Sequence, residues 1–229
     1  MIKLYFHPSP NPMKVVLFLE ETGLPYEIVP VDTRKGEQHL PDYLKINPNA
    51  KTPTMTDGDV VIFDSSAIML YLAEKSGGQF MTANDPVTRG QMLSWLMFIA
   101  TGIGPYSGQA VHFQHFAPEP KEYAVNRYVF EAERHYGILD ARLATQEWLV
   151  GDHYSFIDMS LWGWERAMPR VVADVWTKFP NIKRHFDAIN ARPAAERAAA
   201  FATKFTFKQE MDADARRAMF PGNARIGVL

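Results

Sequence analysis

Two residues that can donate hydrogen bonds, Ser9 and Asn11, stand in a proline-rich turn near the start of the chain. Donors at the N-terminus of a helix can stabilise a thiolate, because that helix end carries a partial positive charge. A free thiol ionises at about pH 8.5, and one or two charge-assisted hydrogen bonds of about 1.5–3 kcal/mol can lower that pKa by about one to three units. The alternative is that both residues only form the turn, with Asn11 capping a helix that begins at Pro12.

The chain contains no cysteine. Disulfide bonds, thiolate metal sites and a cysteine nucleophile are therefore excluded. If Ser9 and Asn11 stabilise a thiolate, the thiol must belong to a bound molecule.

A second polar group, Asp64-Ser65-Ser66, precedes an apolar helical stretch. The helix N-terminus favours a carboxylate, while the Asp64 carboxylate can hold an ammonium group. Together they fit the α-amino-acid end of a ligand. Simple N-capping explains the same residues equally well, because Ser and Asp are preferred at that position.

A third feature is Thr52-Pro53, which stands directly before a short predicted strand. Proline is disfavoured inside a strand because it has no N–H for the ladder. A cis peptide bond at Pro53 would turn the chain and leave the backbone of Thr52 unpaired. Such a backbone can pair with a bound peptide in the manner of an added strand.

The elements that must position these residues change character along the chain. Up to residue 80 the pattern predicts β-α-β-loop-β-β-α, with Asp57-Gly58-Asp59 as a hairpin turn. From residue 87 onward only helices are expected, the first of them interrupted at Gly102–Pro105, and Ser155 and Asp158 form a capping box. We therefore predict an α/β domain at 1–80, an all-helical domain at 88–205 and a tail at 206–229.

Composition narrows the function classes. The formal net charge of -2 argues against a nucleic-acid partner, because phosphate binding needs clustered Lys and Arg. No apolar run reaches the roughly 20 residues that span a bilayer, and the start lacks a signal-peptide core, so we expect a cytoplasmic protein without a membrane partner. No metal is expected, since His112 and His115 have no third ligand nearby in the sequence.

These motifs, in this order, resemble the cytosolic glutathione transferase family over nearly the whole chain. The turn Pro8–Asn11, the stretch Gly102–Pro105 and the phrase Gln109–Phe113 are most similar to the Nu class and its fungal nitrogen-regulator relatives. The resemblance implies a thioredoxin-like α/β N-terminal domain, an all-α C-terminal domain and a homodimer. It also implies glutathione as cosubstrate, which would supply the missing thiol.

The resemblance assigns roles to individual residues. Its expected contacts are Ser9 and Asn11 with the glutathione sulfur, Thr52 and cis-Pro53 with the cysteinyl backbone, Gln38 and Lys51 with the glycyl carboxylate, and Asp64 and Ser65 with the γ-glutamyl group. Relatives usually carry Glu at the Asp64 position, so this side chain is shorter. Arg127 matches an arginine that approaches the thiol site in Nu-like dimers, from its own or the partner subunit.

The implied activity is attack of bound glutathione thiolate on an electrophile, with glutathione-dependent disulfide reduction and peroxidase activity as expectations. The alternative is a non-catalytic glutathione-binding regulator or interaction module on the same fold. Tyr5, at the end of the first strand, is a second candidate for thiol activation. The aromatic residues that either line the electrophile pocket or belong to the core are Trp95, Phe98, Tyr106, Phe113 and Phe116.

Overall fold

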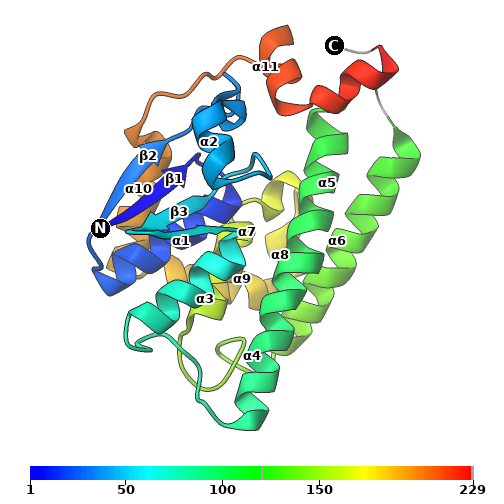
Figure 1. The fold of residues 1–229 in the computed structure, drawn as a ribbon. Coiled ribbons are helices and arrows are strands. Elements are labelled where there is room, and N and C mark those ends of the chain that lie inside the picture. Colours follow the sequence, from blue (N-terminus) through cyan, green and yellow to red (C-terminus); the bar gives the residue numbers. More distant parts are fainter. Residues whose placement is uncertain (120, 228–229) are drawn as a thin grey trace.

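The computed structural model describes residues 1–119 and 121–227 (Figure 1). Its N-terminal part holds one mixed sheet with the strand order β2-β1-β3-β4. Strand β1 runs parallel to β2 and antiparallel to β3, which forms a hairpin with β4. The strands are β1 (Ile2–Phe6), β2 (Tyr26–Pro30), β3 (Thr54–Asp57) and β4 (Val60–Phe63). The predicted order of strands and the hairpin turn are confirmed, but the predicted loop between β2 and β3 contains a 3-10 helix at Glu37–His39 and a short α-helix.

Three helices accompany this sheet: α1 (Pro10–Thr22), α2 (Pro41–Ile46) and α3 (Ser65–Lys75). The prediction that α1 begins at Pro12 is wrong. Pro10 already occupies its first turn and Ser9 is the N-cap residue, because the fixed φ of proline suits the first helical position. Asn11 therefore lies inside the first turn of α1 and does not cap it.

The second part of the chain is helical. It contains α4 (Pro86–Phe98), α5 (Gly104–His115), α6 (Glu122–Leu143), α7 (Phe156–Glu165), α8 (Val175–Lys178), α9 (Pro180–Asn190) and α10 (Pro193–Lys204). The expected interruption at Gly102–Pro105 is not a break. A π-helical turn over Ile99–Ile103 joins α4 to α5, and Pro105 falls in the first turn of α5, where a missing N–H is tolerated.

Helix α7 is the centre of the interface between the two parts. All its residues are buried, and it packs along α1. Gly163 makes this close approach possible, because a Cβ atom there would lie 2.4 Å from the Pro10 carbonyl oxygen and 3.0 Å from Lys14 Cβ. Any larger residue at this position would push α7 away from α1.

The predicted capping box at the start of α7 is present and belongs to a buried ionic cluster. One oxygen of Asp158 accepts from the Ser155 backbone N–H, and the other lies 3.1 Å from His185 Nε2. His185 Nδ1 lies 2.7 Å from Glu165 Oε1. Burial alone would lower the pKa of His185, but the Glu165 and Asp158 carboxylates outweigh it and raise that pKa to about 10. The imidazolium thus joins α7 to α9.

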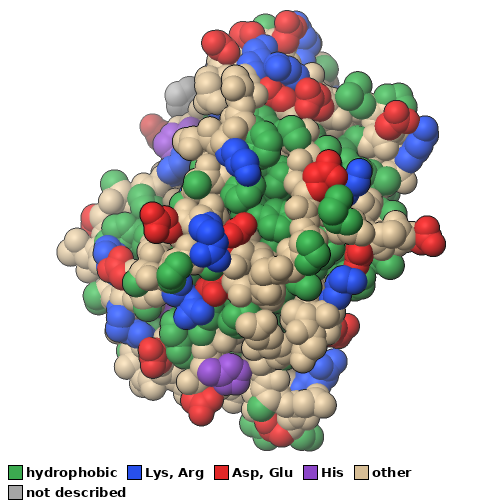
Figure 2. All heavy atoms as spheres, turned by 90° about the vertical axis from the view of Figure 1, so that its left-hand side faces the viewer, with side chains coloured by type: hydrophobic (Ala, Val, Ile, Leu, Met, Phe, Trp, Pro, Cys, Tyr) green, Lys and Arg blue, Asp and Glu red, His purple; other side chains and the backbone are tan. Residues whose placement is uncertain are grey.

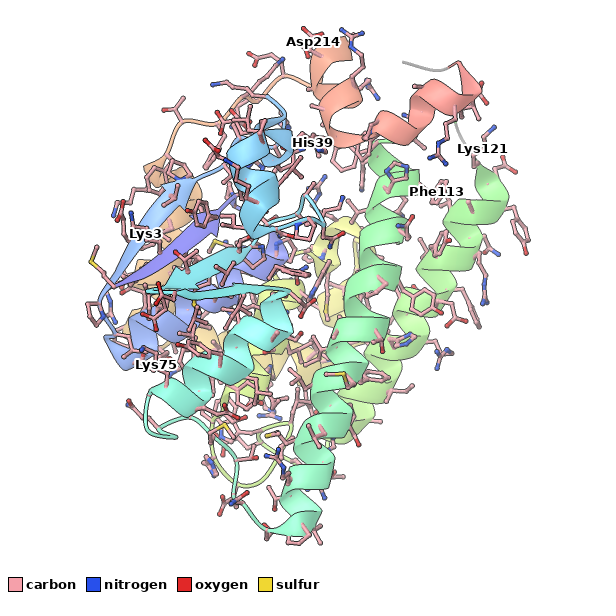
Figure 3. All side chains as sticks on the ribbon, in the orientation of Figure 1. Lys3, His39, Lys75, Phe113, Lys121 and Asp214 are labelled. Carbon is pink, nitrogen blue, oxygen red and sulfur yellow. The ribbon has the colours of Figure 1, made fainter. Side chains whose placement is uncertain are left out.

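Beyond α10 the tail returns to the N-terminal part and crosses above α2 toward the end of α5 (Figure 1). It contains α11 (Ala213–Met219) and a 3-10 helix at Pro221–Ile226. Gln38 Nε2 and His39 Nε2 lie 3.2 and 2.9 Å from the Ala218 carbonyl oxygen, and Figure 3 shows His39 below α11. Arg34 donates to the carbonyl oxygens of Lys208 and Gln209. Side chains of the N-terminal part therefore hold the tail by its backbone.

The face at the left of Figure 1 carries Lys, Arg, Asp and Glu side chains interspersed with one another (Figure 2).

Two ion pairs fasten α10 to α1, Arg192–Glu21 at 2.5 Å and Arg197–Glu20 at 2.6 Å. No helix among the described residues is long and apolar enough to cross a membrane.

Candidate active site in the interdomain cleft

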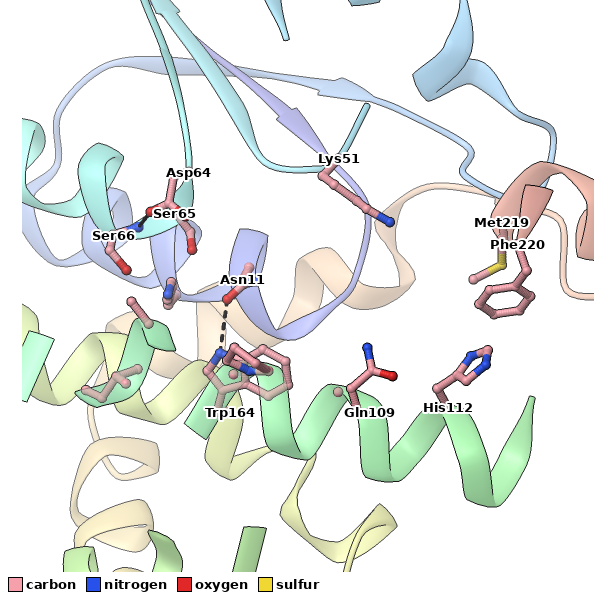
Figure 4. Close-up of a pocket in the computed structure, with 16 residues that line it drawn as sticks. Asn11, Lys51, Asp64, Ser65, Ser66, Gln109, His112, Trp164, Met219 and Phe220 are labelled. Atoms are coloured by element: carbon pink, nitrogen blue, oxygen red, sulfur yellow. Dashed lines mark hydrogen bonds between the residues drawn. The ribbon is translucent and has the colours of Figure 1, made fainter. Parts of the chain in front are cut away.

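A cleft lies between the N-terminal part and helix α5 (Figure 4). It consists of a cavity of about 550 Å³ and an adjoining one of about 400 Å³, which share Lys51, Trp164 and Phe220 among their lining residues. Volumes of this order hold small-molecule ligands. Every contact residue expected from the sequence lines one of the two cavities, apart from Pro53 and Arg127.

Asn11 is held in one orientation at the centre of the cleft. Trp164 Nε1 on α7 donates to Asn11 Oδ1 at 3.0 Å (Figure 4). Because the carboxamide oxygen is occupied, the Nδ2 amide group is left to donate to a ligand. Sequence reasoning missed Trp164, whose partner lies 153 residues away along the chain.

Ser9 contributes a hydroxyl group that the fold does not use for capping. Its extended backbone makes it the N-cap residue of α1, but its side chain forms no cap hydrogen bond. The hydroxyl lies 3.5 Å from the His7 carbonyl oxygen, which is too long for a strong bond. Neither Ser9 nor Asn11 therefore uses its side chain for the capping hydrogen bond that the structural alternative predicts.

The loop at Pro53 is built to present backbone. The Thr52-Pro53 peptide bond is cis, as predicted, and Thr52 lines the second cavity. Buried Asn47 donates to the Lys51 carbonyl oxygen at 2.7 Å, and the Tyr43 hydroxyl donates to the same oxygen at 2.6 Å. These two supports were not anticipated from the sequence.

Asp64 occupies an uncommon backbone conformation, with φ 73° and ψ 123°. Its Oδ1 atom accepts a hydrogen bond from the Ser66 N–H at 2.8 Å (Figure 4). The same atom accepts a second one from the Ala67 N–H at 3.2 Å. The capping interpretation is thus correct for this oxygen. Non-glycine residues with such positive φ values cost about 1–3 kcal/mol and cluster at functional sites.

The two residues expected at the glycyl carboxylate differ in availability. The ammonium group of Lys51 points into the cleft (Figure 4). Gln38 instead uses its amide nitrogen for the carbonyl oxygens of Thr33 and Ala218, both at 3.2 Å, and its buried Oε1 atom has no partner. The tail therefore occupies the Gln38 amide donor that the family resemblance assigned to the glycyl carboxylate of the ligand.

Two further candidates lie away from the cavities. Arg127 is on α6, outside the cleft, and pairs with Glu131 at 3.0 Å. Tyr5 lies on β1 with its ring edge-on to Tyr43 at 5.7 Å, and it lines neither cavity. This geometry favours Ser9 and Asn11 over Tyr5 as the groups nearest a bound thiol.

The apolar wall of the cleft differs from the expected one. Of the five aromatic candidates only Phe116 lines it, while Phe113 points toward α6 and stacks on Tyr128 at 5.4 Å (Figure 3). Trp95, Phe98 and Tyr106 pack against the helical core. The wall is formed instead by α5, by Trp164 and by the tail residues Met219 and Phe220. A signal for the α5 face was available, because Gly104, Gly108 and His112 recur every four residues.

Comparison with known protein families identifies both parts. Residues 1–74 match the glutathione S-transferase N-terminal domain and residues 95–193 match the C-terminal domain. The chain belongs to the glutathione S-transferase family. The sheet and helices described above are the fold of that family, as expected from the sequence.

Individual relatives agree with this assignment. The chain is 40% identical over 205 residues to the disulfide-bond oxidoreductase YfcG of Escherichia coli K12, covering 86% of this chain and 94% of the relative. The glutathione transferase URE2P8 from Phanerochaete chrysosporium, solved with oxidised glutathione, superposes with a TM-score of 0.82 at 34% identity, covering 89% and 95% of the two chains. A glutathione transferase from Burkholderia graminis, solved with two glutathione molecules per subunit, also has a TM-score of 0.82, at 36% identity and 89% coverage of both chains.

Proposed function

We propose that this protein is a glutathione-dependent disulfide reductase that holds the glutathione thiolate at Ser9 and Asn11. The observation that carries the proposal is the hydrogen bond from Trp164 to the Asn11 oxygen, which leaves the amide group of this cleft-lining residue available to donate. The relative YfcG is named a disulfide-bond oxidoreductase, and the related fungal structure holds oxidised glutathione. Both support the same reaction here.

The reaction needs two molecules of glutathione, because the chain has no cysteine of its own. The first thiolate attacks one sulfur of a disulfide, forms a mixed disulfide and releases the other half as a thiolate. A second glutathione thiolate then attacks the glutathione sulfur of that mixed disulfide, giving oxidised glutathione and the second product thiol. The two adjoining cavities provide room for both glutathione molecules.

The remaining contacts follow the order of the three units along the glutathione molecule. Lys51 pairs with the glycyl carboxylate, the backbone of Thr52 pairs with the cysteinyl unit, and Asp64 with Ser65 receives the γ-glutamyl group. Gln38 contributes indirectly, through the tail that it anchors. The same thiolate can attack the terminal oxygen of a hydroperoxide or an activated arene, so peroxidase and conjugation activities accompany the reductase.

The test is steady-state reduction of 2-hydroxyethyl disulfide by glutathione, run beside conjugation of 1-chloro-2,4-dinitrobenzene. Strong disulfide reduction with weak conjugation is expected, and Asn11→Ala and Ser9→Ala should each lower the reductase kcat tenfold or more. If neither variant changes turnover, the assignment of the thiol site is wrong. Glutathione binding without activity in either assay would mean that the protein is a binding module.

We further propose that the protein acts as a homodimer in the cytoplasm, where the glutathione pool is kept reduced. Exposed apolar side chains lie on the edge strand β4, including Val61 and Phe63, and on α4 and α6, including Met97 and Phe130. Exposed apolar side chains of this kind favour association. Arg127, on the same helix α6 as Phe130, would then approach the thiol site of the partner subunit. Sedimentation equilibrium tests the dimer, and a monomeric mass at micromolar concentration would contradict it.

A further inference from the structure

The buried side chain of Lys14 is the feature of the cleft that the proposed function does not use. Lys14 lies on α1, one turn after Asn11, and is only 1% exposed. It nevertheless lines the larger cavity, together with Asp64, Ser65 and Ser66. Within residues 1–119 and 121–227 its ammonium group has no hydrogen bond and no ion pair.

A buried ammonium without a partner is strongly unfavourable. Burial lowers the pKa of Lys14 to about 8, and the nearby Asp64 carboxylate opposes that change. The stem of the side chain is enclosed because α7 approaches α1 so closely that a Cβ atom at Gly163 would lie 3.0 Å from Lys14 Cβ. The fold therefore places a cation at the cleft wall and does not neutralise it.

The surroundings of Lys14 indicate which ligand group it faces. It shares its cavity with the N-terminus of α3, whereas Ser9, Thr52 and Gln38 line the other cavity. At this helix end the N–H groups of Ser66 and Ala67 are already bonded to Asp64 Oδ1. The helix thus has fewer free donors for a ligand carboxylate than an uncapped helix would have. A carboxylate bound there needs another positive partner.

We propose that Lys14 is a further binding residue of this site and that its ammonium group pairs with the α-carboxylate of the γ-glutamyl unit. The inference rests on glutathione being the ligand of the cleft. Asp64 then faces the α-ammonium of the same unit. Lys14 and Asp64 thus each pair with one of the two charges of this amino-acid group. A ligand without that carboxylate would leave Lys14 buried and unpaired, which gives the site its selectivity for a γ-glutamyl compound.

The experiment is a cycle of two ligands and two proteins, measured by isothermal titration calorimetry at pH 6.5. The ligands are glutathione and 4-aminobutanoyl-cysteinyl-glycine, which lacks only the α-carboxylate. The wild-type protein should bind glutathione at least tenfold more tightly than this analogue. Lys14→Met should bind both ligands within about threefold of each other, because truncating one partner of a buried charge pair removes the discrimination.

Lys51→Met is the matched control, since it removes a second lysine from the same cleft. It should weaken both ligands by the same factor and keep the tenfold discrimination. Discrimination that persists in Lys14→Met, or that is absent from the wild-type protein, would overturn the proposal. A wild-type protein that binds neither ligand would instead overturn the proposed function. Lys14→Gln serves as a second variant, and circular dichroism verifies that each variant is folded.

Discussion

Replacing Lys14 by Met should stabilise the ligand-free protein while it weakens glutathione binding. The pKa of Lys14 falls from 10.5 to about 8 because the ammonium is buried without a partner. At about 1.4 kcal/mol per pKa unit, the folded protein loses about 3 kcal/mol by keeping this group charged at neutral pH. Methionine has a similar length and no charge, so the variant avoids this loss. For a chain of this size the midpoint of thermal unfolding should rise by about 6–12 °C.

The lowered pKa of Lys14 also makes this difference in stability depend on pH. Because the pKa of Lys14 is lower in the folded than in the unfolded state, the unfolded chain binds more protons between about pH 8 and 10.5. The destabilisation is therefore fully present below pH 8 and disappears as the pH rises through this window. The difference in unfolding free energy between Lys14→Met and the wild-type protein should shrink accordingly. Buried tyrosines titrate in both proteins, and their contributions cancel in the difference.

Urea denaturation followed by tryptophan fluorescence, at pH 7 and at pH 10, provides the measurement. Lys45→Met is the control, because Lys45 is exposed and pairs only with Asp42 on the surface. Its midpoint should not change measurably at pH 7. If Lys14→Met is no more stable than the wild-type protein at pH 7, the ammonium is already neutralised in the folded state. The inference that it awaits a ligand carboxylate would then lose its basis.

Three other perturbations follow from the geometry. Trp164→Phe removes the N–H that orients Asn11, so it should lower the reductase kcat with little change in the KM for glutathione. The double variant Trp164→Phe with Asn11→Ala should be no slower than Asn11→Ala alone. Additive effects of the two substitutions on kcat would contradict the positioning role of Trp164. His185→Gln leaves two buried carboxylates without their cation and should cost about 3–5 kcal/mol in urea denaturation, whereas an unchanged midpoint would refute the buried imidazolium. Phe220→Ala removes aromatic contacts with His112 and Phe116, and should raise the KM for 1-chloro-2,4-dinitrobenzene more than that for glutathione.

The sequence was sufficient for features that depend on local chemistry. Gly58 between two short apolar runs determined the β3–β4 hairpin, and Ser155 with Asp158 determined the start of α7. The cis bond before Pro53 followed from the absent N–H of proline at a strand. Such signals work because the residues concerned satisfy their own backbone within a few positions.

Features that depend on long-range packing were missed. Asn11 and Trp164 meet only because α7 packs on α1, and Phe220 reaches the cleft only because the tail folds back. Neither contact leaves a local pattern. Lys14 did leave one, since it is the single charge among the otherwise apolar side chains of 12–19, all of them buried. A lone lysine inside a predicted buried helix, one turn from a candidate site residue, is a local sequence signal for a functional residue.

The hydrogen bonds that hold the tail to the N-terminal part affect which tail residues can change during evolution. The side chains of Arg34, Gln38 and His39 form hydrogen bonds with main-chain oxygens of the tail, including that of Ala218, and not with tail side chains. Substitution of the side chains of Lys208, Gln209 and Ala218, whose carbonyl oxygens are bound, can therefore leave these hydrogen bonds in place. The two cleft-lining residues of the tail, Met219 and Phe220, are thus free to vary under selection for new substrates while the anchor persists. Changes at these two positions would alter the wall of the cleft without altering the residues of the N-terminal part that line it.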